Sequence, residues 1–110
     1  MVKINALLMV YLLIFCFSLS KVSARISLYK NYPNPLNPKT FISWQLNEIS
    51  QVNLDVYNIL GQKVAALLSE KQNAGKHSVE WDASDFPSGL YFYRLQAGYF
   101  VQTRRMLLIK

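Results

Sequence analysis

The fold follows from the stretch Gln51-Val52-Asn53-Leu54-Asp55-Val56-Tyr57, in which apolar and polar side chains alternate strictly. Successive side chains of a β-strand point to opposite faces, so a period of two indicates a strand with one buried face. Here the buried face is expected to carry Val52, Leu54 and Val56. Because this pattern is typical of antiparallel sheets with one face on a core, it favours an all-β protein.

The same alternation recurs at residues 40–46, 77–81 and 91–96. Residues 63–68 fit a strand or a helix, and we predict a strand because Gly61 and residues 73–75 bracket a run too short for a typical helix. The side chains expected on the buried faces of the three alternating runs are Ile42, Trp44, Leu46, Val79, Trp81, Tyr91, Tyr93 and Leu95.

Turn residues separate these runs at short intervals. They occur at residues 58–61, at residues 73–75 and at Ala97-Gly98, where glycine supplies the backbone angles of tight turns. About seven short strands without a convincing helix predict an antiparallel β-sandwich. The sequence does not fix the order of the strands.

The last segment, residues 99–109, departs from simple alternation. Arg104 and Arg105 are both charged, and the four residues 106–109 are continuously apolar. We therefore predict a β-bulge near Arg104-Arg105 and burial of residues 106–109 on both faces of the sheet.

The first residues have the organisation of a cleavable signal peptide. Lys3 precedes an apolar run at residues 4–17, and Val22-Ser23-Ala24 forms a small-residue cleavage site. The alternative is an uncleaved anchor, but a membrane-spanning helix needs about 20 apolar residues and this run is shorter. We expect cleavage after Ala24, which divides the chain into a signal peptide (1–24) and one small domain (25–110).

Cysteine content and charge limit the class of protein. Cys16 is the only cysteine and lies in the apolar run, so the processed chain has no disulfide. Without Lys3 and Lys21, ten basic side chains stand against six acidic ones. This balance allows weak attraction to anionic surfaces but indicates no particular ligand.

The sequence offers no convergent catalytic or metal-binding groups, and we predict a non-enzymatic protein without metal or cofactor. His77 is the only histidine, and it falls on the expected buried face of its strand. Asp82 and Asp85 lack the spacing of a calcium loop and favour Asx-type turns. The aromatic cluster at residues 91–100 permits a sugar-stacking face, but we favour cross-strand aromatic pairing within this hairpin.

Five sequence blocks in register resemble a known family. They are Tyr32-Pro33-Asn34-Pro35-Leu36-Asn37-Pro38 and residues 56–64, 75–83, 88–95 and 105–110. Their order and spacing resemble the type A C-terminal sorting domain of the type IX secretion system (the Por secretion system) of Bacteroidetes and relatives. Leu36 is a departure, since the family often has Phe there. The family-motif residues of this chain are Tyr32, Pro33, Asn34, Pro35, Asn37, Pro38, Gly61, Gly89 and Tyr91.

The resemblance implies an immunoglobulin-like β-sandwich that directs export of an attached cargo. Such a cargo crosses the inner membrane by its signal peptide, passes the periplasm and reaches the cell surface or the medium. Implied partners are the outer-membrane translocon, a sortase-like surface protease and anionic lipopolysaccharide, with no nucleic acid and no membrane span after cleavage. The residues expected to carry recognition are Arg104, Arg105, Met106, Leu107, Leu108, Ile109 and Lys110, and the proline-rich run shapes the start of the domain.

Little sequence separates the predicted signal peptide from the domain, so no cargo is evident. We expect either a truncated reading frame or a free-standing small exported protein. An alternative function is a free-standing immunoglobulin-like surface module with a binding or structural role, as the related sandwich of flagellar hook-capping proteins suggests. A hydrolase would need convergent groups that the sequence does not provide.

Overall fold

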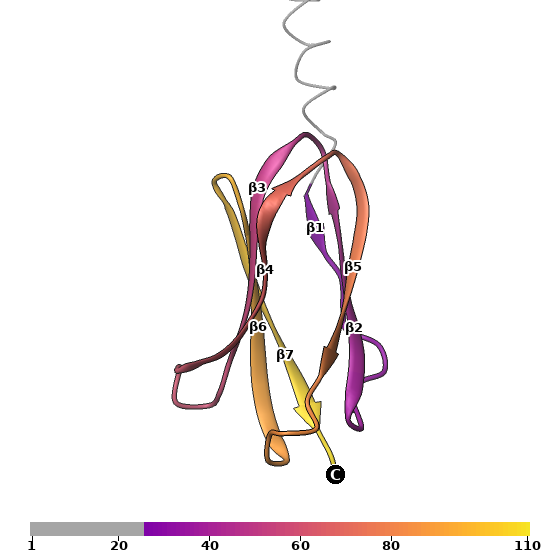
Figure 1. Cartoon of the computed structure of the whole chain (residues 1–110), viewed down its shortest axis with the longest axis vertical. Helices are drawn as coiled ribbons and strands as arrows, with labels where there is room; N and C mark the ends of the chain where they lie inside the picture. The colour runs from indigo at the N-terminus through magenta and orange to yellow at the C-terminus, as the bar shows by residue number, and fades with distance from the viewer. Residues whose placement is uncertain (1–25) are drawn as a thin grey trace, which may run out of the picture.

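The computed structural model describes residues 26–110, which form two β-sheets facing each other (Figure 1). The predicted signal peptide, its cleavage at Ala24 and Cys16 lie outside the described residues. Within residues 26–110 there are seven strands and no helix, and therefore no helix that could span a membrane. The strands are β1 (Ser27–Leu28), β2 (Lys39–Leu46), β3 (Ser50–Tyr57), β4 (Lys63–Gln72), β5 (Gly75–Asp82), β6 (Gly89–Ala97) and β7 (Phe100–Leu108).

The strands form a three-stranded sheet, in the order β1-β2-β5, and a four-stranded sheet, in the order β4-β3-β6-β7. All strand pairs are antiparallel. The Arg104 Nε of β7 donates a 2.7 Å hydrogen bond to the Leu28 carbonyl of β1, so the edge strands β1 and β7 lie on the same side of the molecule. The predicted antiparallel sandwich is confirmed, and the structure supplies the strand order.

The core lies between the sheets and is built from the alternating residues of the strands. The expected buried faces are confirmed, except that Val79 is only partly buried. Burying a large apolar side chain contributes about 1.5–3 kcal/mol, so this core is the main stabilising element of a small domain. The buried apolar residues are Leu28, Leu36, Ile42, Trp44, Leu46, Val52, Leu54, Val56, Trp81, Ala83, Tyr91, Tyr93, Leu95, Ala97, Met106 and Leu108.

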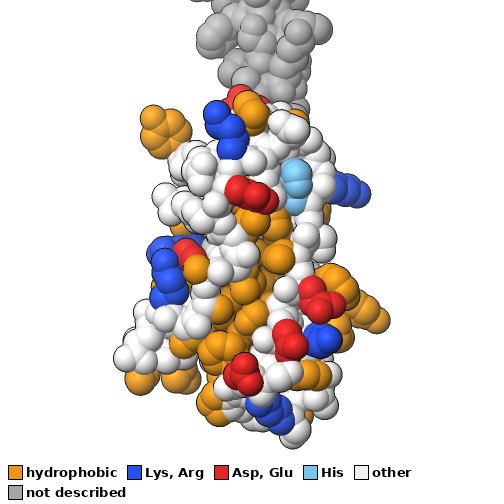
Figure 2. Space-filling view, in the orientation of Figure 1, with side chains coloured by type: hydrophobic (Ala, Val, Ile, Leu, Met, Phe, Trp, Pro, Cys, Tyr) orange, Lys and Arg blue, Asp and Glu red, His pale blue; other side chains and the backbone are white. Residues whose placement is uncertain are grey.

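Strand β4 is confirmed where the sequence pattern was ambiguous. Its pairing with β3 shifts register at Leu54/Asp55 and again at Val56/Tyr57. Each shift changes which side chains of β4 face the core, and this explains why Val64, Leu67 and Leu68 are only partly buried. Figure 2 shows apolar side chains exposed along the opening between the two sheets in this view.

The turn between β3 and β4 is organised by Asn58. Its Oδ1 accepts hydrogen bonds from the backbone N–H groups of Leu60 and Gln62, both at 3.0 Å. The family-motif residue Gly61 has φ +80° in this turn, a left-handed conformation that disfavours side chains with a Cβ. Gly98, with φ +60°, lies in the tight turn between β6 and β7.

The predicted bulge near Arg104-Arg105 is wrong. The register of β6 with β7 runs without interruption from Gly89↔Leu108 to Ala97↔Phe100. Met106 and Leu108 are buried, whereas Leu107 and Ile109 are 40% and 46% exposed, so residues 106–109 are not buried on both faces. The prediction failed because Arg104 points inward with the core residues and satisfies its Nε on a backbone carbonyl at the sheet edge.

Candidate recognition site

The proline-rich run and the terminal strand β7, which the sequence suggested separately, contact each other. The Leu36 N–H donates to the Leu107 carbonyl (2.9 Å), and the Ile109 N–H donates to the Leu36 carbonyl (3.0 Å). The Leu107 N–H also donates to Asn34 Oδ1 (3.1 Å). Leu36 forms a parallel bridge with Leu108 and is fully buried, so Leu fills the position at which the family often has Phe.

Asn31 and Tyr93 hold the other side of the proline-rich run. The Asn31 backbone N–H donates to the Tyr93 hydroxyl (3.0 Å), which donates to the Tyr29 carbonyl (2.8 Å). Asn31 Nδ2 donates to Thr40 Oγ1 (3.1 Å) and to the Pro33 carbonyl (3.2 Å). Tyr93 was predicted only as a core residue and Asn31 was not predicted, because no local spacing links these residues to the run.

The environment of Tyr93 predicts a loss of stability at alkaline pH. Burial raises the pKa of the Tyr93 hydroxyl, while the Asn31 hydrogen bond and the Arg104 charge oppose the rise. The folded state therefore favours the neutral phenol. The stability that comes from the neutral Tyr93 hydroxyl is fully present below the unfolded pKa of about 10. It is lost as the pH rises through the higher pKa of the folded state. We expect the free energy of unfolding, measured by urea titration, to fall above pH 10, and to fall less in Tyr93→Phe than in the unmodified chain.

Tyr99 provides the matched control for this measurement, because its side chain is fully exposed at the β6–β7 turn. Tyr99→Phe should keep the full alkaline dependence of the unmodified chain. Equal dependence on pH in Tyr93→Phe and Tyr99→Phe would contradict the role given to Tyr93.

The predicted recognition residues differ in burial. Met106 and Leu108 belong to the core, Arg104 is partly buried, and Arg105, Leu107, Ile109 and Lys110 are exposed. The Lys110 N–H donates to Ser88 Oγ (2.9 Å), and Lys110 Nζ contacts the Ser84 carbonyl. The end of the described chain is therefore tied to the loop between β5 and β6.

The family-motif residues do not gather in one place. Apart from the buried Leu36, the proline-rich run is mostly exposed, and Tyr32 is 80% exposed. The Pro38 carbonyl accepts a hydrogen bond from the Ala83 N–H (2.9 Å). Gly89 begins β6, and the buried Tyr91 donates its hydroxyl proton to the Pro87 carbonyl (2.7 Å). These placements give most motif residues a part in shaping the domain.

A cavity of about 610 Å³, which we call the basic pocket, lies beside the middle of β7. Among residues 26–110, the ion pairs are Lys39 with Glu80 and Lys63 with Asp55, so none of the pocket's three cations takes part in one. No carboxylate lines the pocket. Its lining residues are Lys30, Asn34, Phe92, Tyr93, Thr103, Arg104 and Arg105.

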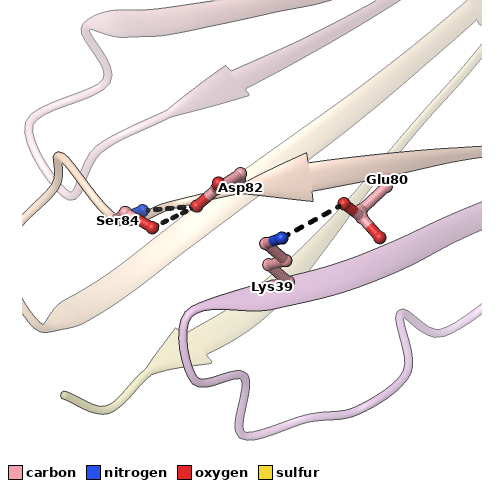
Figure 3. Close-up of polar contacts among 4 residues, drawn as sticks. All are labelled: Lys39, Glu80, Asp82 and Ser84. Carbon is pink, nitrogen blue, oxygen red and sulfur yellow. Dashed lines mark hydrogen bonds and ion pairs between the residues drawn. The ribbon is translucent and has the colours of Figure 1, made fainter.

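The loop after β5 forms the predicted Asx-type turn (Figure 3). Asp82 Oδ1 accepts hydrogen bonds from the Ser84 backbone N–H (3.0 Å) and from the Ser84 hydroxyl. These bonds lower the pKa of the Asp82 carboxyl. Beside the turn, Lys39 of β2 lies 4.0 Å from Glu80 of β5. Across residues 26–110, no three His, Cys, Asp or Glu side chains gather where they could hold a metal ion.

His77 and the aromatic cluster occupy structural positions. His77 lies on the same face of β5 as Trp81, as predicted, and stacks on Trp44 with ring centroids 6.0 Å apart. The predicted aromatic pairing within the β6–β7 hairpin is wrong. The register places Tyr91 and Tyr93 of β6 opposite Met106 and Arg104 of β7, so they have no aromatic partner there. Tyr91 instead packs against Trp81 (5.6 Å) and Phe86 (6.3 Å).

Comparison with known proteins agrees with this architecture. The chain matches the family model of the secretion system C-terminal sorting domain over residues 30–110. No match was found among curated proteins. Two solved structures from Porphyromonas gingivalis share the fold at low identity. Dimeric latent PorU is 17% identical, with a TM-score of 0.61 over 76% of this chain. PorZ, an essential surface component of the type IX secretion system of that bacterium, is 19% identical, with a TM-score of 0.54 over 76% of this chain.

This chain corresponds to only 9% of the PorU chain and 12% of the PorZ chain, so these likenesses concern one domain of much larger proteins. At such identities they show the fold alone. The family match covers most of the sequence and agrees in extent with the sandwich. The chain therefore belongs to the secretion system C-terminal sorting domain family.

Proposed function

We propose that residues 25–110 are a non-enzymatic targeting domain that directs export across the outer membrane by the type IX secretion system. The observation that carries this proposal is the family match over residues 30–110, which covers nearly the whole sandwich. Residues 1–24 act as the signal peptide, removed after Ala24, and bring the chain to the periplasm. The destination is the cell surface or the extracellular space.

The translocon reads the terminal segment, residues 104–110. Two properties support this assignment. Strand β7 is an edge strand of the four-stranded sheet, and edge strands are the usual place for binding a further chain. The exposed side chains of Arg105 and Leu107 lie on one face of β7 and the exposed Ile109 follows it, so a partner can reach them without disturbing Met106 and Leu108.

The partners in this proposal are the outer-membrane translocon and a sortase-like surface protease, with anionic lipopolysaccharide as a further ligand. The excess of basic over acidic side chains is compatible with an anionic partner. Nucleic acid has no part in the proposal, because an exported protein rarely meets it.

Export of a reporter tests the proposed function. Residues 26–110 are fused behind a signal peptide and a reporter protein in a host with a type IX system. We expect the reporter in the medium or on the surface, and we expect Arg105→Glu/Leu107→Ser/Ile109→Ser to lower export at least about tenfold, the usual effect of losing binding hot spots. Deletion of residues 104–110 should abolish export.

Lys71→Glu/Ser78→Ala is the control for the triple variant, because both residues are exposed and lie on β4 and β5. It should be exported normally. A reporter that stays in the periplasm with the unmodified domain, or that leaves the cell after deletion of residues 104–110, would contradict the proposed function.

A second candidate is a free-standing surface-binding module. The fully exposed Tyr99 and the half-buried Phe92 favour it, since exposed aromatic rings stack on sugars. Pull-down on surface polysaccharide, compared between the unmodified chain and Phe92→Ala/Tyr99→Ala, tests this function. Retention that does not depend on the two rings would contradict it.

A further inference from the structure

The outer edge of β7 offers backbone groups at alternate residues. In an antiparallel pair, residues alternate between bonding their neighbour strand and pointing away from it. The bonds of Leu107 and Ile109 to the proline-rich run show that these residues point away from β6. By the same alternation, the N–H and C=O groups of Val101, Thr103 and Arg105 point to this edge.

Only part of this edge is covered. Asn34 and Leu36 bond to Leu107 and Ile109, next to the end of β7. Of the strands in the described part of the chain, β6 alone pairs with β7. Residues 101–105 therefore form an open edge, which would accept a further strand by main-chain hydrogen bonds.

Positive charge lies at the end of this open edge that adjoins the basic pocket. Thr103, Arg104 and Arg105 belong to both the edge and the pocket, which Lys30 also lines. Arg104 lies on the inner face of β7 and Arg105 on its outer face, because their side chains alternate. Arg104 Nε is bonded to the Leu28 carbonyl, which orients the guanidinium and leaves its two terminal nitrogens for an incoming carboxylate.

We propose that residues 101–105 bind an extended acidic peptide segment, which adds to the four-stranded sheet as a further strand. Carboxylates on either face of the added strand would have a cationic partner, since Lys30 and Arg104 lie on one face and Arg105 on the other. Charge complementarity with these cations favours an acidic segment. The basic pocket provides space beside β7 for its side chains. Only the assignment of this acidic segment to a protein of the export machinery rests on the proposed function. The proposed strand addition moves the centre of recognition from residues 104–110 toward residues 101–105.

Nuclear magnetic resonance with two synthetic peptides tests the proposal. The isotope-labelled full chain, held in a zwitterionic detergent, is titrated with the blocked peptide TEVEVT and with its basic counterpart TKVKVT. We expect TEVEVT to protect the amides of Val101, Thr103 and Arg105 from solvent exchange. The basic counterpart should bind at least about tenfold more weakly, because like charges meet across the contact.

Matched variants separate the main chain from the charges. Thr103→Pro removes a donor at the open edge, where proline is tolerated, and Thr103→Ala keeps it. We expect Thr103→Pro to weaken binding of TEVEVT at least about tenfold and Thr103→Ala to leave it nearly unchanged. The double variant Lys30→Gln/Arg105→Gln should also weaken binding of TEVEVT at least about tenfold. Lys71→Gln/Lys76→Gln, which loses the same charge on β4 and β5, should leave binding unchanged. Comparison of these two double variants keeps the test decisive if Thr103→Pro does not fold.

Equal affinity for the two peptides, or protection confined to other strands, would overturn the proposal. Pyrophosphate is titrated for comparison. Shifts of Lys30, Arg104 and Arg105 with pyrophosphate, but no amide protection with TEVEVT, would assign the pocket to a free anion and overturn strand addition. Because these measurements are made without a secretion host, failure of peptide binding with normal reporter export would count against this inference alone.

Discussion

Leu108→Asp should abolish cooperative unfolding of the domain, whereas Leu107→Asp should leave it folded. Leu108 is buried against Leu36 and the core, so the variant loses its hydrophobic contribution and places an unpaired carboxylate among apolar side chains. Burial of an unpaired charge costs several kcal/mol, a large part of the stability of a domain of this size, which is about 5–10 kcal/mol. The neighbouring Leu107 side chain faces solvent on the other side of the strand.

Circular dichroism during heating measures this difference. We expect no cooperative transition for Leu108→Asp and a transition close to that of the unmodified chain for Leu107→Asp. The pair also tests the regular alternation of β7. Similar damage from both substitutions would indicate that residues 106–109 are buried on both faces, which would contradict the structure.

Leu36→Ala should lower the free energy of unfolding by about 3 kcal/mol, within the range of about 2–5 kcal/mol for truncation of a buried leucine. In a domain of this size, that loss corresponds to a fall of roughly 12–24 °C in Tm. The reason is that Leu36 is fully buried and its backbone bonds to β7 on both sides. Truncation leaves a cavity where the proline-rich run meets the terminal strand.

Tyr32→Ala is the control for this variant, because Tyr32 belongs to the same run and is mostly exposed. Its Tm should change by no more than a few degrees. Amide exchange gives a second measure, since Leu107 and Ile109 should exchange faster in Leu36→Ala than in Tyr32→Ala. An unchanged Tm in Leu36→Ala would mean that the run does not contribute to the core.

Strands and turns of this domain were predictable because they are encoded by local patterns. The alternation at Val52, Leu54 and Val56 fixes a buried face whatever the strand order. The sheet order was not predictable, because several arrangements bury the same faces. The contact of Asn34 with Leu107 joins residues 73 apart in sequence, and no local pattern encodes such a contact.

The candidate site was predicted in its parts and not in its assembly. The terminal strand and the proline-rich run were identified, but the bulge near Arg104 was wrong because charge was taken as a sign of outward orientation. An arginine at a sheet edge can point inward when its guanidinium reaches a backbone carbonyl, as Arg104 reaches the Leu28 carbonyl here. The basic pocket was not predicted, because Lys30 and Arg105 come together only in the folded sandwich.

The position of β7 at the end of the described chain also determines when the domain can fold during synthesis. Leu36 and Tyr93 are synthesised before β7, which covers Leu36 and pairs with Tyr93. Until residues 100–108 have been made, the four-stranded sheet lacks its edge strand and the core stays accessible to water. Closure of the sandwich therefore has to wait for β7, and a ribosome-bound chain that stops before residue 100 exposes its apolar residues to water.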